Sequence, residues 1–207
     1  MDKELDRLSY ALGMSMGHNF KASGIDKIDS ADFAAGVAAV YEGAEMRMTY
    51  DEAKAVIRDY FTALEAKQQE AAKEMAAINA AAGEKFLNEN GVRPEVHTTA
   101  SGLQYEIVTK GEGPVPTAQD RVVVHYTGRL IDGTVFDSSE ERGEPATFGV
   151  TQVIPGWVEA LQMMPAGSTW RLFIPSALAY GPQGAGGAIG PNQTLIFDVT
   201  LLSVEGK

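Results

Sequence analysis

The residue types most able to do chemistry gather in one stretch, from His125 to Ser139. Apolar side chains at every second position leading to Tyr126 predict a strand. Asp132-Gly133 then predicts a tight turn, because glycine accepts a positive φ. The hairpin that results brings Tyr126 next to Phe136 and Asp137. The stretch therefore offers two aromatic rings and one carboxylate, without the spacing of a metal site.

Other kinds of site find little support elsewhere in the chain. The three histidines, His18, His97 and His125, lie far apart, and none has a carboxylate or second histidine at a convincing ligand spacing. The chain has no cysteine, which excludes disulfides, thiol nucleophiles and cysteine-zinc sites. The glycine-rich stretch 181–190 has no lysine and leads into a strand, whereas a nucleotide-binding loop needs a following helix. We therefore expect neither a metal nor a cofactor.

Composition restricts the class of protein and its partners. With 207 residues, of which 44% are hydrophobic, the chain can form one large or two small packed domains. A net charge of −11 disfavours nucleic acid and anionic membranes, because binding phosphates needs clustered Lys and Arg. No apolar leader or membrane-spanning run is recognisable. The expected location is the cytoplasm, with the periplasm or outer membrane as the alternative for a chain that has lost its leader.

Two short amphipathic helices are predicted at the N-terminus. The first shows apolar residues at three- and four-residue spacing and ends at Ser23-Gly24. The second begins after Asp29 or Ser30 as the N-cap and ends at Gly43. Helices of this length bury little surface by themselves, so they need another surface to pack against.

The sequence leaves the partner of these helices open. Gly13 and Gly17, four residues apart, are either a site of close helix-helix approach or merely small surface residues. A second copy of the chain is the expected partner, which makes the protein a homodimer. Docking of a different protein is the alternative.

A long helix is predicted after the two short ones. Thr49 and Glu52 form a capping-box pattern, and the helix can run to Asn90-Gly91, where Gly91 is expected to be a left-handed stop. About forty residues at ~1.5 Å each give a length of ~60 Å. Residues 65–73 are polar all round, which is typical of a helix that bridges domains through solvent. An ordinary charged surface helix is the alternative, and Gly83 is expected to weaken or bend the helix.

The pattern changes after a polar connector over residues 92–101. Short strands and turns follow, with one short helix that begins at Pro155 and ends at Pro165. Several antiparallel strands with one short helix predict an α+β fold. The remaining expected segments are strands over 103–108, 170–174 and 195–201, a charged loop over 138–145 and a glycine-rich loop over 179–191.

The hairpin sequence, VHYTG followed by DGT and FDSS, resembles the signature of the FKBP-type peptidyl-prolyl cis-trans isomerases. Three further stretches agree in the same order, and the resemblance covers roughly residues 93 to 207. The N-terminal part resembles, less specifically, the helical dimerisation region of the macrophage infectivity potentiator-like subfamily. The three stretches are Val153-Ile154-Pro155-Gly156-Trp157, Ile174-Pro175 through Leu178-Ala179-Tyr180-Gly181, and Thr194-Leu195-Ile196-Phe197-Asp198-Val199.

The resemblance implies a complete domain organisation. A helical dimerisation module occupies residues 1–48, a long connecting helix 49–91, and an isomerase domain 92–207. In the isomerase domain an antiparallel half-barrel sheet wraps around one short helix.

The resemblance also implies an apolar pocket that holds a proline ring, although residues at strand spacing are by themselves more typical of a packed core. Family members carry an aromatic residue at the position of Ala146 and, in some cases, larger side chains at Ala185 and Ala188; these departures bear on flanking-residue preference and drug affinity. The implied catalytic residues are Tyr126, Phe136 and Phe197 as walls, Tyr180 as a hydroxyl donor to a substrate carbonyl, and Asp137, which orders the site through hydrogen bonds with Tyr126 or Arg142. The implied substrate-binding residues are Trp157 as the floor, Ile154 through its backbone N–H, and Arg142, Val153 and Ile189.

The activity implied by the resemblance is isomerisation of X-Pro bonds in unfolded or partly folded proteins. Two such domains in a dimer would hold a client chain by avidity, so folding-chaperone activity is expected as well. Rapamycin-type macrolides are the expected inhibitors. The alternative from another class is a chaperone or binding module that docks proline-containing segments without catalysis.

Overall fold

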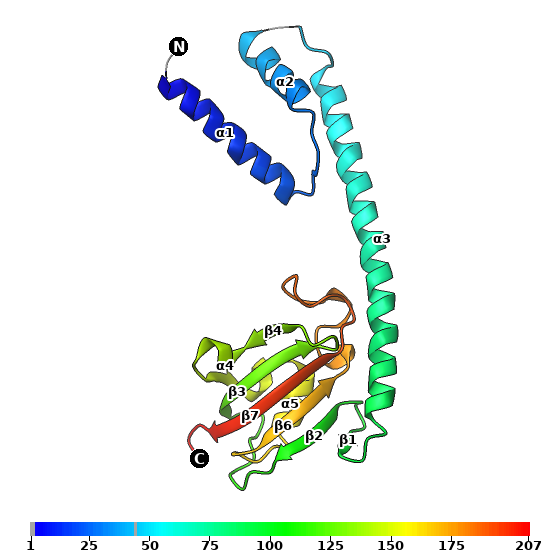
Figure 1. Ribbon diagram of the computed structural model, residues 1–207, viewed down its shortest axis with the longest axis vertical. Helices are drawn as coiled ribbons and strands as arrows, with labels where there is room; N and C mark the ends of the chain where they lie inside the picture. The colour runs from blue at the N-terminus through cyan, green and yellow to red at the C-terminus, as the bar shows by residue number, and fades with distance from the viewer. Residues whose placement is uncertain (1–2, 44) are drawn as a thin grey trace. The chain divides into compact units, whose positions relative to one another are not determined.

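The computed structural model describes residues 3–43 and 45–207. The chain divides into two compact units, residues 1–69 and residues 70–207. The division falls within the long helix α3 (Tyr50–Asn90), so the first half of α3 belongs to the N-terminal unit and the second half to the C-terminal unit (Figure 1). The predicted domain borders at 48/49 and 91/92 stay a prediction.

The N-terminal unit consists of α1 (Lys3–Ala22), α2 (Ser30–Glu42) and the first half of α3. Asp29 is the N-cap of α2, because its Oδ1 accepts hydrogen bonds from the backbone N–H groups of Ala31 and Asp32 at 2.9 and 3.0 Å. Gly43, with φ 68°, ends the helix in the left-handed conformation. Both predicted helix ends are confirmed.

Side chains in this unit remain accessible in a single chain. From residue 4 to residue 69, no side chain that the structure describes is buried. Large apolar side chains stand out into solvent, among them Leu8 at 55% exposure and Val40 at 57%. A contact between the rings of Phe20 and Phe33, with centroids 5.4 Å apart, links α1 to α2.

The predicted long helix is confirmed, and the capping box explains where it begins. The backbone N–H of Glu52 donates to Thr49 Oγ1 at 3.2 Å, and the Glu52 carboxylate accepts from the Thr49 backbone at 2.8 Å. The prediction that Gly91 is a left-handed stop is wrong: its N–H donates to the carbonyl of Leu87 at 2.9 Å, and its φ is not positive. Glycine is needed there because a Cβ would lie 2.8 Å from Nε2 of Gln104.

The C-terminal unit is built on one antiparallel sheet of seven strands in the order β1-β2-β6-β7-β3-β4, with β5 also paired to β3 (Figure 1). The fold class predicted from the sequence, α+β with a curved antiparallel sheet, is confirmed. The strands are β1 (Val96–Thr98), β2 (Gln104–Thr109), β3 (Arg121–Leu130), β4 (Val135–Ser138), β5 (Ala146–Gly149), β6 (Thr169–Ile174) and β7 (Leu195–Val204).

Three short elements differ from the expectations. β1 lies inside the predicted polar connector, the one-turn helix α4 (Ser139–Arg142) lies in the expected charged loop, and β5 lies just after that loop, where no element was predicted. The helix α5 (Pro155–Leu161) begins at Pro155 as predicted but ends four residues before Pro165. Three or four residues are too few for a hydrophobic period to show, so these elements leave no pattern in the sequence.

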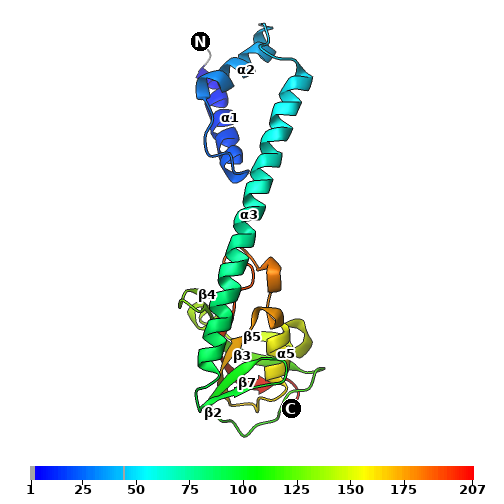
Figure 2. The same cartoon turned by 90° about the vertical axis from the view of Figure 1, so that its right-hand side faces the viewer.

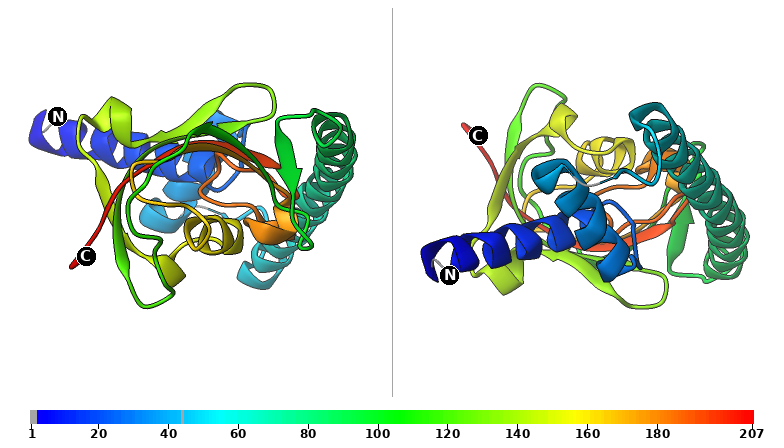
Figure 3. Two further views of the ribbon diagram at one scale, coloured as in Figure 1. Left: turned by 90° about the horizontal axis from the view of Figure 1, so that it is seen from below. Right: turned by 90° about the horizontal axis from the view of Figure 1, so that it is seen from above.

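The sheet curves around α5, and the core lies between them (Figure 3). Buried and more exposed residues alternate along most of β7, as the period of two requires. Gly156 lets α5 approach the sheet, because a Cβ there would lie 2.6 Å from Cγ2 of Ile174. The fully buried core side chains from the sheet and α5 include Val122, Val124, Leu161, Leu172, Ile174, Leu195, Val199 and Leu201.

In the part of the chain that the structure describes, no helix is long and apolar enough to cross a membrane.

Candidate functional site

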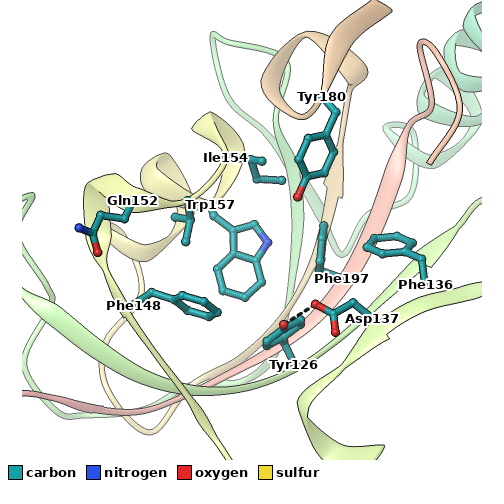
Figure 4. Close-up of a pocket in the computed structure, with 10 residues that line it drawn as sticks. Tyr126, Phe136, Asp137, Phe148, Gln152, Ile154, Trp157, Tyr180 and Phe197 are labelled. Atoms are coloured by element: carbon teal, nitrogen blue, oxygen red, sulfur yellow. Dashed lines mark hydrogen bonds between the residues drawn. The ribbon is translucent and has the colours of Figure 1, made fainter. Parts of the chain in front are cut away.

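A pocket of about 380 Å³ opens on the side of the sheet that faces α5 (Figure 4). Most of its walls are aromatic or aliphatic, and few polar groups reach it. The residues that line it are Tyr126, Phe136, Asp137, Phe148, Gln152, Val153, Ile154, Trp157, Tyr180 and Phe197.

The hairpin of β3 and β4 places one side of the pocket. Its turn closes through hydrogen bonds from the backbone N–H of Leu130 to Thr134 at 2.9 Å and from Gly133 to Leu130 at 3.0 Å, with Gly133 at φ 90°. In the pairing that follows, Gly128 lies opposite Asp137. A Cβ on Gly128 would come within 2.6 Å of the ring of Phe136. Glycine at this position therefore lets aromatic rings lie directly over the strand.

Trp157, on α5, forms the floor of the pocket and is only 3% exposed. The rings of Tyr126 and Phe197 stand at 89° and 85° to it, each with its centroid 5.3 Å from that of the indole. Phe148 makes a similar edge contact at 6.0 Å, and Phe136 packs edge-on against Phe197 at 5.5 Å. Edge-to-face packing fixes each ring through its neighbours, so the floor and walls are rigid.

Asp137 is the charged group of the pocket, and two partners hold it. The hydroxyl of Tyr126 donates to its Oδ2 at 2.5 Å, and Arg142 forms an ion pair with its Oδ1. Arg142 also donates to the Tyr126 hydroxyl at 3.0 Å, and its guanidinium carbon lies 5.6 Å from the centre of the Tyr126 ring. The three side chains thus form a closed triangle of hydrogen bonds.

The triangle changes the protonation of its members in a consistent direction. Burial raises the pKa of Asp137, but the hydrogen bonds from Tyr126 and Arg142 outweigh burial and leave the pKa below its usual value. Burial, followed by the hydrogen bond to Asp137, raises the pKa of Tyr126 above its usual range. The hydrogen bonds to Tyr126 and Asp137 raise the pKa of Arg142. At neutral pH the site therefore holds a carboxylate, a neutral phenol and a guanidinium.

The two serines after Asp137 hold the triangle in place. Ser139 is completely buried, and its Oγ accepts a hydrogen bond from the backbone N–H of Tyr126 at 2.8 Å. Ser138 is the N-cap of α4, with its Oγ accepting from the backbone N–H of Glu141 at 3.3 Å. That one-turn helix carries Arg142, so the local sequence positions the guanidinium.

The opposite rim of the pocket is formed by Ile154 and Tyr180. Ile154 precedes α5 as its N-cap residue, in an extended conformation with φ −60° and ψ 150°. Tyr180 lies between two short 3₁₀ helices, Ser176–Leu178 and Gly181–Gln183, and is 40% exposed. Its hydroxyl points into the pocket, toward the space between Trp157 and the hairpin (Figure 4).

All predicted site residues line this pocket except Arg142 and Ile189. Arg142 reaches the site through Asp137 and Tyr126. Ile189 is buried in the core at 8% exposure and pairs with Ala185 through backbone hydrogen bonds of 2.8 and 3.0 Å. Its predicted contact with substrate stays a prediction.

Sequence reasoning missed two lining residues, Phe148 and Gln152. Phe148 stands two positions after Ala146 on β5, so the two share a face of the strand. This spacing could have identified Phe148, because the resemblance placed an aromatic residue at the position of Ala146 and Phe148 is an aromatic residue on the same face of the strand. Gln152 has no comparable signal; its Oε1 accepts from the backbone N–H of Gly149 at 3.3 Å in the short helix before α5.

Among residues 3–43 and 45–207, no group of three or more His, Asp or Glu side chains could hold a metal ion. The pocket therefore offers apolar contact, one ordered carboxylate and a phenol at its rim.

Comparison with known proteins gives matches along nearly the whole chain. Residues 113–202 match the model for "FKBP-type peptidyl-prolyl cis-trans isomerase", and residues 5–107 match the model for "Domain amino terminal to FKBP-type peptidyl-prolyl isomerase".

Individual relatives agree with the family models over both units. Outer membrane protein MIP of Legionella longbeachae is 50% identical over 97% of this chain and 85% of its own. The FKBP-type 22 kDa peptidyl-prolyl cis-trans isomerase of Escherichia coli is 45% identical over 95% of this chain and 93% of its own. The crystal structure of FkpA from Escherichia coli matches with a TM-score of 0.74 and 36% identity, covering 98% of this chain and 95% of that one.

Proposed function

The chain belongs to the Mip-like subfamily of FKBP-type peptidyl-prolyl cis-trans isomerases, and we propose that it catalyses this reaction in the pocket over Trp157. The observation that carries the proposal is the indole floor, enclosed by aromatic rings at right angles to it. A proline ring is compact, apolar and small enough to pack on such a floor. The reaction needs no bond to be made or broken, because only rotation about the X-Pro amide is required.

The physical problem is the rotational barrier of the amide. Partial double-bond character gives a barrier of roughly 18–20 kcal/mol, so uncatalysed exchange takes tens of seconds or longer. The planar amide is polar, with charge on its oxygen, and the twisted amide is less so. An apolar pocket therefore favours the twisted form relative to the planar one, and catalysis follows from this difference in binding.

Hydrogen-bond donors at the rim complete the proposed mechanism. The Tyr180 hydroxyl donates to one substrate carbonyl, and the backbone N–H of Ile154 donates to another. Asp137 stays ionised and holds Tyr126 as a wall. These roles rest on the positions of the three residues around the floor and on the low pKa of Asp137.

We propose that the chain works as a homodimer through the N-terminal unit. No described side chain there is buried within one chain, and a cavity of about 590 Å³ lies beside α2. Val40, Met46 and Ala53 are among the residues that line this cavity. Space is open around Gly13 and Gly17, since no atom would lie within 4 Å of a Cβ added at either position, which leaves room for a close helix.

Two further properties follow from this proposal. A dimer holds two catalytic pockets for one unfolded client, which supports chaperone activity through avidity. Rapamycin-type macrolides are proposed inhibitors, because the family resemblance implies that they bind the pocket that takes proline. The cytoplasmic location stays a prediction, which cell fractionation tests.

The direct test is exchange of an X-Pro tetrapeptide with and without rapamycin. We expect the chain to accelerate cis-to-trans exchange and rapamycin to abolish the acceleration. Acceleration that the drug leaves unchanged would contradict the pocket assignment. A chain that binds proline peptides without accelerating their exchange would instead be a binding module.

A further inference from the structure

The loop that carries Tyr180 is rich in glycine, although Ala185 and Ile189 pair through backbone hydrogen bonds within it. Between Tyr180 and Pro191 it contains four glycines with positive φ, at positions 181, 184, 186 and 187. Glycine costs more conformational entropy to order than any other residue, so contacts from outside such a loop help to fix its conformation. A donor that must meet a substrate carbonyl needs its position fixed to well within the length of a hydrogen bond.

Such contacts come from the C-terminal half of α3, within the same compact unit (Figures 1 and 2). Asn79 on α3 is buried at 8% exposure, and its Nδ2 donates to the carbonyl of Pro191 at 2.8 Å. The Nδ2 of Asn192 donates in the opposite direction, to the carbonyl of Ala76 at 3.3 Å. Two reciprocal side-chain bonds thus join helix and loop.

Asn192 also contacts Gly181, the residue next to Tyr180. The backbone N–H of Asn192 donates to the carbonyl of Gly181 at 2.9 Å. Asn192 has φ 56°, the one positive φ on a non-glycine residue in the described part of the chain. This conformation lets the backbone N–H of Asn192 donate to Gly181 while its side chain donates to Ala76 of α3. Asn192 therefore connects α3 to the residue next to Tyr180.

The packing of α3 on this segment is as close as the backbone allows. A Cβ on Gly83 would lie 2.3 Å from Oγ1 of Thr194, and one on Gly190 would lie 3.2 Å from Nδ2 of Asn79. Both ends of the contact therefore depend on a missing side chain. Gly83 permits this approach, and its expected weakening or bending of the helix stays a prediction.

We propose that α3 positions Tyr180 for catalysis, with Asn79 and Asn192 as the positioning residues. Neither asparagine lines the pocket, so each acts through the loop. The inference rests on the role proposed for the Tyr180 hydroxyl. It gives the connecting helix a part in catalysis beyond that of a spacer.

The test uses the full-length chain and two independent variants. Asn192→Gly keeps the positive φ without strain and removes the donor to Ala76, and Asn79→Ala removes the donor to Pro191. We expect each to lower kcat/KM for an X-Pro tetrapeptide about fivefold, the effect of one net hydrogen bond. Asn88→Ala, an exposed asparagine on the same helix, is the matched control and leaves kcat/KM unchanged. Thermal unfolding confirms that each variant is folded at the assay temperature.

A double-mutant cycle separates positioning from general damage. In the Tyr180→Phe background the asparagine variants have no hydroxyl to misplace, so we expect them to cause no further loss. Two results would overturn this inference alone. One is a loss of kcat/KM that adds in full in the double variants, and the other is an unchanged kcat/KM in the asparagine variants while Tyr180→Phe is impaired. An unimpaired Tyr180→Phe would overturn the role of the hydroxyl and this inference with it, while leaving the isomerase activity intact.

Discussion

At the scale of single residues, the site depends on the triangle of Asp137, Tyr126 and Arg142. Each member satisfies the others, so no unpaired charge faces the apolar floor. The carboxylate is partly exposed, with 41% of its side chain accessible, and its ion pair contributes little to stability on that account. The carboxylate instead serves to hold the Tyr126 ring in place as a wall of the pocket.

The lowered pKa of Asp137 predicts how activity depends on pH. A carboxyl group whose pKa is lower in the folded chain contributes its stability above the ordinary value of about 3.9 and loses it as pH falls toward the folded value. We expect kcat/KM for a tetrapeptide to stay flat from pH 8 to about pH 5 and to fall only below about pH 4. The raised pKa of Tyr126 keeps its hydroxyl protonated across this range.

Asp198 provides the control for this pH profile. The pKa of Asp198 is also below its usual value. Burial raises this pKa, but the hydrogen bonds from Arg171 and Arg129 lower it by more than burial raises it. It lines no part of the pocket, so Asp198→Asn changes acid stability without changing the activity profile. Asp137→Asn should lower activity at all pH values. A profile with a titration near pH 6 to 7 in the native chain would contradict this account.

Gly128 predicts a substitution that damages the site from within a strand. A Cβ at this position would lie 2.6 Å from the ring of Phe136 and 2.7 Å from that of Phe197. We expect Gly128→Ala to lower the free energy of unfolding by about 1–3 kcal/mol and to reduce kcat/KM, because both rings must move. Denaturant unfolding and the tetrapeptide assay measure the two effects.

Gly133→Ala is the matched control for Gly128→Ala. It strains a turn with φ 90°, but no atom lies within 4 Å of its Cβ. It should cost about 1 kcal/mol of stability and leave kcat/KM unchanged. Equal loss of activity in both variants would mean that the rings over Gly128 have no special role.

At the scale of elements, the long helix begins where its capping box is formed. Thr49→Ala removes the Oγ1 that accepts from Glu52 and also frees the carboxylate of Glu52 from the Thr49 hydroxyl. We expect about 1 kcal/mol less stability in the first turn of α3, seen as faster amide hydrogen exchange there. Thr62→Ala, an exposed threonine inside the same helix, should keep or slightly improve helix stability, because alanine has the higher helix propensity. Faster exchange in Thr62→Ala would contradict this reasoning.

The elements also show what the sequence can specify. The ends of α2 and the start of α3 were predictable because Asp29, Gly43 and Thr49 act locally. The role of Gly91 was misread, and the close approach of Thr194 to Gly83 was not foreseen, because Gln104 and Thr194 lie outside the helix. A local pattern contains no information on such contacts.

The candidate site shows the same difference between residues that a local pattern predicts and residues that depend on distant contacts. The hairpin residues were predictable because one turn brings them together, and the family resemblance supplied the distant positions. Phe148 was missed because β5 is too short to show a period and only the spacing from Ala146 marks it, and Gln152 was missed because nothing in the short helix after β5 marks it. The anchoring of the Tyr180 loop by α3 depends on two asparagines that no motif marks.

At the scale of the whole molecule, the proposed dimer through the N-terminal unit predicts the mass in solution. Sedimentation equilibrium of the full chain, whose mass is 22.1 kDa, should give twice that mass. Val40→Glu places a charge in the apolar cavity beside α2 and should give a monomer that keeps its tetrapeptide activity. Refolding of a large client should suffer, because avidity is lost.

The control for the dimer is Lys67→Glu, which reverses an exposed charge on α3. It should leave the mass and the refolding activity unchanged. A native chain that sediments as a monomer at micromolar concentration would contradict the dimer, and the N-terminal helices would then dock a different protein.

The central claim, that catalysis occurs in the aromatic pocket over Trp157, is tested most directly by one comparison. Phe136→Ala removes a wall of the pocket, whereas Tyr105→Ala removes an aromatic ring that stacks on Trp170 outside the pocket, with centroids 4.4 Å apart. We expect Phe136→Ala to lower kcat/KM for an X-Pro tetrapeptide by about tenfold or more, equivalent to about 1.4 kcal/mol of transition-state binding. Tyr105→Ala should lower stability and leave kcat/KM unchanged. An unchanged kcat/KM in folded Phe136→Ala, or an equal loss in both variants, would contradict the assignment of the active site.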